Sequence, residues 1–218
     1  MGSEILIFGG GEFARLVRRY IARYTDWKAV AFVVDAAYRN VDKLDGLPVL
    51  SYEEALRALP PADVGAAVAI GYKGMSSGRR DAFKRLKTAG YSLPNLIHPS
   101  AFVECDAIGE GNLILEQCDI CFGSRMGDCN LFWGGAMLSH DTVVGSFNTF
   151  ARADFGGFCV VGDNCFFGLN STVKDHVKVA DFTFVGPNGY VAKDTQPQSV
   201  YVKQGTKPML GVSSLDVL

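Results

Sequence analysis

Residues 155–173 read FGGFCVVGDNCFFGLNSTV, in which an apolar side chain returns at every sixth position, at Phe155, Val161, Phe167 and Val173. The same spacing runs from residue 97 to residue 191, with two steps of five residues. All of these positions are apolar, although only 48% of the chain is. A helix repeats about every 3.6 residues and a strand about every 2, so neither element produces this pattern.

A short internal repeat of this kind predicts a solenoid. We expect three short strands per turn, each with one inward apolar residue, so that a coil of about eighteen residues forms a three-sided prism. Glycine often follows the inward residue, and we expect these glycines at corners, where the backbone leaves ordinary β geometry. They are Gly109, Gly127, Gly145, Gly156, Gly162, Gly168 and Gly186.

The first ninety-six residues have a different rhythm, in which short apolar strands alternate with helices. Strands are expected near 4–8, 28–34 and 64–70, and helices over 12–24 and 79–89. This alternation predicts a small, mostly parallel α/β sheet. Because prolines cluster where the six-residue repeat begins, we place an α/β domain at 1–96, a parallel β-helix at 97–192 and a tail at 193–218.

The composition limits which partners and which cellular compartment we expect. A net charge of −2 argues against nucleic acid as a partner. The chain has no apolar run of membrane-spanning length, and its first residues lack a signal-peptide pattern, so we expect a cytoplasmic protein without membrane contact. Three of the six cysteines, Cys118, Cys159 and Cys165, occupy small inward positions. We therefore expect reduced thiols and no metal.

A glycine-rich loop, Gly9-Gly10-Gly11-Glu12-Phe13-Ala14, lies between the first expected strand and helix. It matches the dinucleotide pattern G-x-G-x-x-G/A, and Asp35 ends the next strand. Backbone N–H groups at a helix start favour a phosphate, and Asp35 can accept hydrogen bonds from a ribose or a base. The domain has room for only about half of a full dinucleotide fold. We favour a nucleotide sugar over NAD(H), with a ligand-free tight turn as the other alternative.

Tyr72 and Lys73 follow the strand that ends at Gly71. They lie at the carboxyl edge of the expected sheet, where ligands of open α/β folds bind. Lys73, Arg79 or Arg80 could meet a diphosphate, and the alternative is a solvated helix face.

His140 is the histidine that we assign to chemistry. It lies in Ser139-His140-Asp141, just past an inward residue, so it projects from a corner with a carboxylate beside it. A carboxylate can fix the tautomer of an imidazole. Adjacent side chains need not point together, so the alternative is an Asp141 that contacts the substrate or the next subunit. The neutral ring can then take a proton from an amine or hydroxyl that attacks an acyl carbonyl, and a corner N–H can stabilise the oxyanion. His98 is expected to be structural and His176 solvated, and the wide spacing of the three excludes a gamma-class carbonic anhydrase site.

Taken together, these motifs resemble the bacterial sugar acyltransferases of the PglD/NeuD type, which are hexapeptide-repeat enzymes with a left-handed β-helix. The resemblance rests on the strand, Gly-rich loop and helix at 5–17, Ile97-His98-Pro99-Ser100-Ala101, and the repeats at 161–171. Ser139-His140-Asp141 precedes Val143-Val144-Gly145, and the match closes with Val191-Ala192-Lys193-Asp194 and Gly205-Thr206-Lys207-Pro208. It implies a Rossmann-like nucleotide-sugar-binding domain followed by a left-handed β-helix.

The resemblance implies a homotrimeric N-acetyltransferase that moves an acetyl group from acetyl-CoA to a nucleotide-linked amino sugar, without a metal. Its setting would be surface-glycan synthesis, such as lipopolysaccharide or glycoprotein. His140 matches the general base, Asp141 the acid beside it, and Gly157 the glycine whose amide faces the thioester. The pantetheine arm would run along Gly168, Leu169, Gly186 and Pro187. The nucleotide site would use Gly9, Gly10, Gly11, Glu12 and Asp35, with Tyr72 and Lys73 nearby.

Two departures from these relatives concern the acyl end of the expected site. Thr149 stands where many of them have a second histidine, and residues 150–157 form a segment one residue shorter. The missing histidine leaves a non-catalytic nucleotide-sugar scaffold open. A sugar O-acetyltransferase of the sialic-acid type and an NAD(H)-binding protein are the other two alternatives. The base of the nucleotide (UDP, GDP or dTDP), the sugar and the acyl group are also open.

Overall fold

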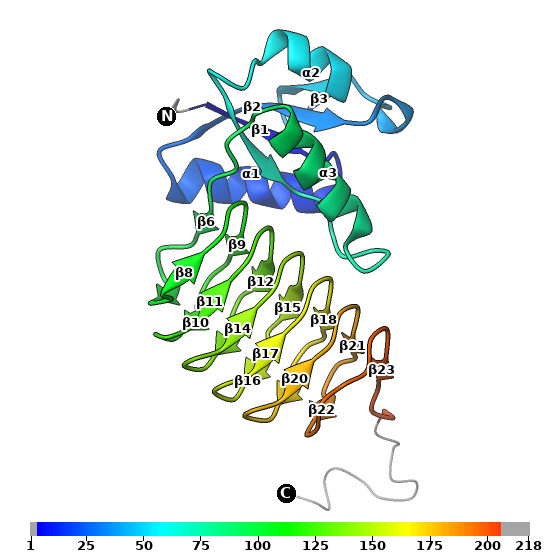
Figure 1. Ribbon diagram of the computed structural model, residues 1–218. Coiled ribbons are helices and arrows are strands. Elements are labelled where there is room, and N and C mark those ends of the chain that lie inside the picture. Colours follow the sequence, from blue (N-terminus) through cyan, green and yellow to red (C-terminus); the bar gives the residue numbers. More distant parts are fainter. Residues whose placement is uncertain (1–3, 206–218) are drawn as a thin grey trace, which may run out of the picture.

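A computed structural model describes residues 4–205 (Figure 1). An α/β domain lies against the first coils of a three-sided column of short parallel strands. The predicted fold class, a Rossmann-like α/β domain followed by a left-handed parallel β-helix, is confirmed. In the part of the chain that the structure describes, no helix has the length and apolar character needed to cross a bilayer.

The α/β domain has a five-stranded sheet in the order β3-β4-β2-β1-β5, parallel except for the short edge strand β3. Its strands are β1 (Glu4–Phe8), β2 (Lys28–Val34), β3 (Lys43–Leu44), β4 (Leu47–Ser51) and β5 (Gly65–Val68). Its helices are α1 (Glu12–Tyr24), the 3-10 helix η1 (Ala36–Tyr38), α2 (Tyr52–Ala58) and α3 (Ser77–Thr88).

Local sequence explains where two of these helices lie. The face of α1 that carries Ala14, Val17 and Ile21 is buried, whereas its arginines face outward. Helix α2 starts with a capping box: Ser51 accepts a hydrogen bond from the Glu54 N–H, and Glu54 accepts one from the Ser51 N–H.

The β-helix has three faces, each built from one strand per coil. Face A contains β6 (Leu96–Ile97), β9 (Leu113–Ile114), β12 (Leu131–Trp133), β15 (Thr149–Ala151), β18 (Phe166–Phe167), β21 (Phe184–Val185) and β23 (Val200–Tyr201). Face B contains β7 (Phe102–Val103), β10 (Asp119–Ile120), β13 (Met137–Leu138), β16 (Asp154–Phe155), β19 (Thr172–Val173) and β22 (Tyr190–Val191). Face C contains β8 (Ala107–Ile108), β11 (Arg125–Met126), β14 (Val143–Val144), β17 (Val160–Val161) and β20 (Lys178–Val179).

The residues of the six-residue repeat point inward. From Ile114 to Val191 every one of them is buried, while Ile97 in the first coil is 37% exposed. Phe132, Phe150 and Phe167 stack on one another along the column, with ring centroids 4.4 and 5.2 Å apart. Strand β23 pairs with β21, so regular pairing continues beyond residue 192, where the β-helix is predicted to end. The remainder of the predicted tail, from residue 206, lies outside the described residues.

The prediction that the repeat glycines supply unusual backbone geometry at the corners is wrong. None of the seven has a positive φ; the left-handed corner positions are filled mostly by other residues, such as Gln117, Asp141 and Asn164. The glycines are needed for space, because a Cβ at Gly145 would collide with the Asp163 carboxylate of the next coil. That carboxylate accepts a hydrogen bond of 2.7 Å from the Ser146 N–H. The same arrangement recurs at three other repeat glycines, Gly109, Gly127 and Gly162, where Asp128, Ser146 and Asp181 of the next coil accept a backbone N–H.

A second ladder runs through the buried corner before face A, where Asn112, Asn130 and Asn148 stack at eighteen-residue intervals. The Oδ1 atom of Asn112 accepts the Asn130 N–H at 2.8 Å, and that of Asn130 accepts the Asn148 N–H at 2.9 Å. The last member, Asn148, accepts the Cys165 N–H at 2.7 Å. The ladder satisfies backbone donors that the corner would otherwise bury without partners.

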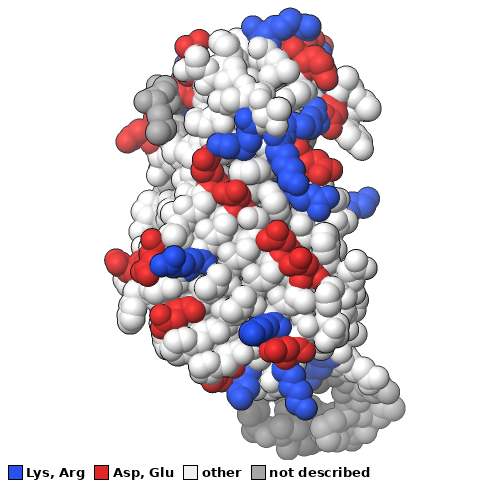
Figure 2. Space-filling view, in the orientation of Figure 1, with Lys and Arg blue, Asp and Glu red and all other residues white. Residues whose placement is uncertain are grey.

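The α/β domain packs on face A and the turns beside it. Phe13 of α1 contacts Trp133, with ring centroids 5.3 Å apart, and Tyr20 donates a hydrogen bond to Glu116. Arg79 of α3 is 1% exposed and donates through Nη2 to the carbonyls of Phe147 and Asn148, both at 2.8 Å. On the side of the molecule shown in Figure 2, acidic and basic side chains are interspersed.

Candidate active site

His140 lies at the corner between β13 and β14, where face B meets face C, and its side chain is 45% exposed. The adjacent side chains meet: His140 Nδ1 is 2.8 Å from Asp141 Oδ2. Asp141 has φ 57, in the left-handed region. Because an ionised carboxylate only accepts hydrogen bonds, this contact puts the proton of the neutral ring on Nδ1. The other ring nitrogen, Nε2, then carries a free lone pair.

Gly157 occupies the equivalent corner position in the next coil, since Met137 pairs with Asp154 in the face B ladder. A Cβ at Gly157 would lie 2.9 Å from His140 Cε1 and 3.0 Å from Nε2, so the imidazole rests over this glycine. Among residues 4–205 the Gly157 N–H has no hydrogen-bond partner. The corner therefore holds a basic nitrogen and a free backbone donor side by side.

The coil that joins these two residues is short. It takes one residue fewer to go from Met137 to its ladder partner Asp154 than from Asp154 to the next partner, Thr172. This shortening falls in the segment 150–157 noted in the sequence.

Aromatic rings line the same corner. Phe122 lies on one side of His140, with ring centroids 6.5 Å apart, and Phe158 meets it edge-on at 5.1 Å. Phe158 in turn stacks on His176 at 4.8 Å. The sequence analysis missed this row of rings. An eighteen-residue spacing indicates it, because one ring-bearing residue stands on each coil, at Phe122, His140, Phe158 and His176. His176 is exposed, and its Nε2 is 3.8 Å from the Asp175 carboxylate.

The glycines of the glycine-rich loop serve two purposes, close packing and the lining of a pocket. Gly9 is needed for close packing, since a Cβ there would collide with the Ala69 carbonyl. Gly10 and Gly11, which precede α1, line a pocket of about 180 Å³ with Val34, Tyr38, Asn40, Val41, Leu44 and Val49. Glu12 points to solvent and pairs with Arg15 at 3.0 Å. Sequence reasoning missed Tyr38, Asn40 and Val41, whose irregular segment carried no motif.

Asp35 does not line this pocket. Its carboxylate accepts a hydrogen bond of 2.6 Å from Arg85, and the Arg85 guanidinium lies 4.1 Å from the centre of the Tyr52 ring. Tyr72 is half exposed and packs against Phe166 of face A, with ring centroids 4.7 Å apart. The adjacent Lys73 is exposed.

Arg79 is not available to a diphosphate, which corrects one of the alternatives above. It is buried between α3 and face A, where Nη2 also contacts Thr149 Oγ1 at 3.0 Å. Burial lowers the pKa of Arg79 to about 10. Thr149, which stands in place of a second histidine, thus accepts a hydrogen bond from the α/β domain on face A and lies away from the His140 corner.

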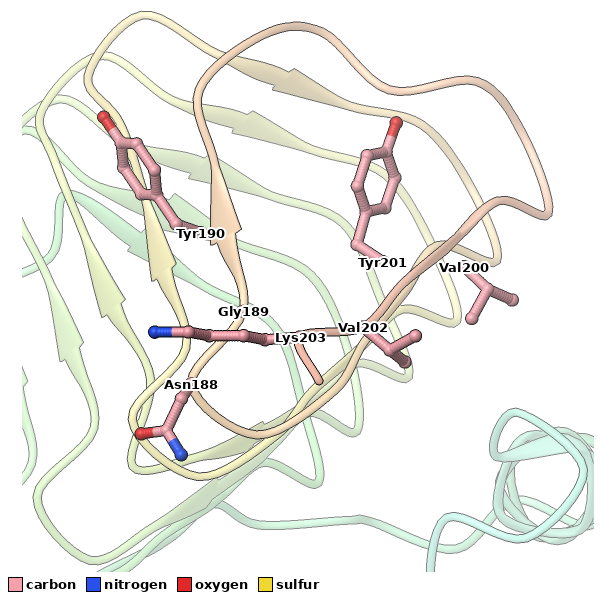
Figure 3. A pocket seen from close by; sticks show the side chains of 7 residues that line it. All are labelled: Asn188, Gly189, Tyr190, Val200, Tyr201, Val202 and Lys203. Carbon is pink, nitrogen blue, oxygen red and sulfur yellow. The ribbon is translucent and has the colours of Figure 1, made fainter. Parts of the chain in front are cut away.

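The remaining predicted donor-site residues lie at another corner, where face A meets face B. Gly168 and Leu169 follow β18, and Gly186 and Pro187 follow β21. They are stacked, because a Cβ at Gly168 would lie 2.7 Å from the Pro187 nitrogen. Beside them, the last coils form a cavity of about 530 Å³ (Figure 3). It is lined by Asn188, Gly189, Tyr190, Val200, Tyr201, Val202 and Lys203.

Within one chain, the structure does not bring the predicted sites together. The α/β domain covers face A, whereas the His140 corner lies between faces B and C, on the opposite edge of the prism. The face A–face B corner is separated from His140 by the width of face B.

The described residues contain no group of three or more His, Cys, Asp or Glu side chains placed to hold a metal ion. The six cysteines are free thiols. Burial raises the pKa of Cys129 and of Cys165 to about 12, which favours the protonated thiol.

These features define a class: an α/β domain on a hexapeptide-repeat, left-handed β-helix with an imidazole at a corner. Residues 4–86 match the family described as the PglD N-terminal domain. The predicted resemblance to PglD-like bacterial sugar acyltransferases is confirmed by this match and by the similar proteins described next, which are themselves acyltransferases.

Two solved structures are similar over nearly the whole chain. The acetyltransferase domain of PglB from Neisseria gonorrhoeae, in complex with acetyl coenzyme A, has a TM-score of 0.81 at 21% identity, covering 92% of this chain and 96% of that chain. A variant of perosamine N-acetyltransferase from Caulobacter crescentus, in complex with CoA and GDP-perosamine, has a TM-score of 0.81 at 26% identity, covering 93% and 97%.

A curated relative is similar over a shorter stretch. It is the acyl-(acyl-carrier-protein)–UDP-N-acetylglucosamine O-acyltransferase of Aliarcobacter butzleri, 31% identical over 114 residues, or 49% of this chain. The match covers 35% of that relative, about a third of its length.

Proposed function

We propose that this protein is an acetyl-CoA-dependent N-acetyltransferase that acts on the amino group of a nucleotide-linked sugar. The observation that carries the proposal is the corner where His140 Nε2, oriented through Asp141, lies next to the free N–H of Gly157. The ligands named for the two similar solved structures, acetyl coenzyme A in one and CoA with GDP-perosamine in the other, support the donor and the acceptor class.

In the proposed reaction, Nε2 of His140 accepts a proton from the sugar amine as the amine nitrogen attacks the thioester carbon. The Gly157 N–H donates to the carbonyl oxygen as that oxygen gains charge. The carbon–sulfur bond then breaks, and the sulfur leaves as CoA thiolate. The imidazolium returns its proton to the thiolate, which restores neutral His140.

The proposal includes a homotrimer whose sites lie between protomers. The nucleotide pocket at Gly10 and Gly11 belongs to a domain on face A, and His140 lies on the opposite edge. A neighbouring protomer can bring its own α/β domain to that edge. Val143 and Val160, which point outward from face C and are 43% and 42% exposed, offer apolar contact area there.

We assign the pocket of about 180 Å³ beside Gly10 and Gly11 to the nucleotide, because it lies at the start of α1, where backbone N–H groups favour a phosphate. A nucleotide-activated amino sugar is a precursor of surface glycans. We therefore extend the proposal to a cytoplasmic step in lipopolysaccharide or glycoprotein glycan synthesis.

A second candidate is transfer to a sugar hydroxyl. The curated relative is an O-acyltransferase, and a neutral imidazole can deprotonate either nucleophile.

The test is an acceptor panel with acetyl-CoA: UDP-, GDP- and dTDP-linked amino sugars, and the matching sugars with a hydroxyl in place of the amine. We expect CoA release and an acetylated product with an amino sugar, identified by mass spectrometry. Acetylation of the hydroxyl series alone would favour the second candidate. Binding of acetyl-CoA without turnover on any acceptor would contradict both.

A further inference from the structure

Gly123 lies directly below the catalytic corner. Asp119 pairs with Met137 in the face B ladder, so Gly123 occupies the same corner position as Asp141, one coil earlier. Its φ of +75 falls in the left-handed region. A Cβ at Gly123 would lie 2.5 Å from Asp141 Oδ1, 3.0 Å from its Cγ and 3.2 Å from its backbone nitrogen. The Asp141 carboxylate therefore rests on a bare α-carbon.

The two oxygens of this carboxylate have different partners. Oδ1 faces Gly123, and Oδ2 holds His140 Nδ1 at 2.8 Å. Since both oxygens belong to one planar group, the space that admits Oδ1 also fixes where Oδ2 points. Gly123 itself is anchored, because its N–H donates to Asp106 Oδ1 at 3.3 Å.

We propose that Gly123 is a positioning residue: its missing side chain forms the slot that seats Asp141, and the seated carboxylate keeps His140 in the Nδ1–H tautomer. The significance for turnover rests on the proposed function, in which Nε2 is the base. The arrangement is two-sided, because Gly157 clears the space above the ring and Gly123 clears the space below its carboxylate.

Gly123→Ala is expected to act on this contact without breaking the fold. The closest obstacle is Oδ1, the end of a side chain that can rotate away. Rotation removes the hydrogen bond to Nδ1, and the ring then loses what fixes its tautomer. With the proton on Nε2, His140 cannot accept one there. A non-glycine residue at this φ also strains the backbone.

Gly135→Ala is the matched control. Gly135 is also a β-helix corner glycine in the left-handed region, with φ +79, but the nearest atom to its Cβ position is Arg152 Cγ at 3.5 Å, an ordinary contact. The control therefore carries the same backbone strain without touching Asp141.

The experiment measures the ring tautomer and turnover separately. Protein labelled with ¹⁵N-histidine gives ring-nitrogen signals from only three histidines, and His140→Gln identifies those of His140. We expect Gly123→Ala to shift His140 toward Nε2–H, as Asp141→Ala does, while Gly135→Ala leaves the Nδ1–H signature. We expect kcat to fall about tenfold to a hundredfold in Gly123→Ala, with little change in the KM for acetyl-CoA.

A double variant tests whether Gly123 acts through Asp141. If it does, adding Gly123→Ala to Asp141→Ala lowers kcat no further, because the two changes remove the same contact. An unchanged tautomer in Gly123→Ala overturns the proposal, whatever its turnover, and so does a fully additive loss in the double variant. A wild-type protein without transferase activity would count against the proposed function, while the tautomer comparison would still decide the role of Gly123.

Discussion

The chemistry at the residue scale depends on which nitrogen of His140 is free. Asp141 holds Nδ1 and leaves Nε2 beside the Gly157 N–H. The same corner, two coils later, carries these residue types in the opposite order: Asp175 precedes His176, and the contact is made through Nε2 at 3.8 Å. Only the first arrangement presents a tethered ring with an available Nε2.

His140→Ala removes the proposed base and is expected to lower kcat by about two to four orders of magnitude. Acetyl-CoA affinity, measured by calorimetry, should change little, because the ring acts on the attacking amine. His98→Ala is the control, since His98 packs against Tyr24 at the start of the β-helix, away from this corner. Near-wild-type turnover of His140→Ala would remove this residue from the mechanism.

The next scale is that of the coil and the contacts between coils. Sequence predicts the three-sided column and the inward side chains, because each inward residue follows a short local period. It indicates the His140–Asp141 pair, because the partners are adjacent, but only the structure shows that the two side chains meet. It does not predict the seat of Asp141, the Asn ladder or the reason for the repeat glycines. Each of these joins residues about eighteen apart, across neighbouring coils.

Asn130→Ala tests the ladder at the scale of the coil. The variant removes the acceptor of the Asn148 N–H and leaves the Asn130 partners Gly127 O and Gly145 O without this donor. Unsatisfied buried polar groups cost about 1 to 3 kcal/mol each, so we expect a loss of about 2 kcal/mol in the free energy of unfolding.

Urea denaturation measures this loss. Thr172→Ala, at an exposed position of β19, is the control and should change stability by less than about 0.5 kcal/mol. Equal stability of the two variants would mean that water replaces the Asn130 side chain.

At the scale of the whole molecule, the pocket at Gly10 and Gly11 lies on the α/β domain, and His140, the proposed base, lies on the β-helix. Sequence could not predict how the domains pack, because Arg79 and face A are about seventy residues apart along the chain. The same holds for Asp35, which follows β2, because its partner Arg85 lies on α3, fifty residues further along the chain. Burial of Arg79 rules out the ligand role that the sequence left open for it, whereas the ligand role expected of Asp35 stays a prediction.

Arg79→Ala is expected to loosen the packing of the α/β domain on the β-helix. It leaves the buried carbonyls of Phe147 and Asn148 without their donor and opens a cavity. We expect a loss of about 3 kcal/mol in unfolding free energy, measured with urea. Lys84→Ala, exposed on the same helix, is the control. If both variants have the same free energy of unfolding as the wild type, the Arg79 contacts do not stabilise the interface.

Shared sites predict complementation between two inactive chains. His140→Ala lacks the base, and Gly11→Phe fills the pocket that we assign to the nucleotide. When the two chains are co-expressed and assemble at random, roughly a quarter of the intersubunit sites should combine an intact base with an intact pocket. Activity in the mixed assembly, measured with the acceptor identified above, should recover to that level. Mixed assemblies as inactive as either parent would mean that each chain works alone.

The stacked corner of Gly123, His140–Asp141 and Gly157 has a consequence for how such a protein can change. Equivalent residues of successive coils stack directly on one another, so a reactive side chain at a corner needs no separate loop to hold it. It needs a neighbour above and a neighbour below that are small enough to make room. Substitutions that enlarge Gly123 or Gly157 can therefore abolish activity although His140 and Asp141 are unchanged.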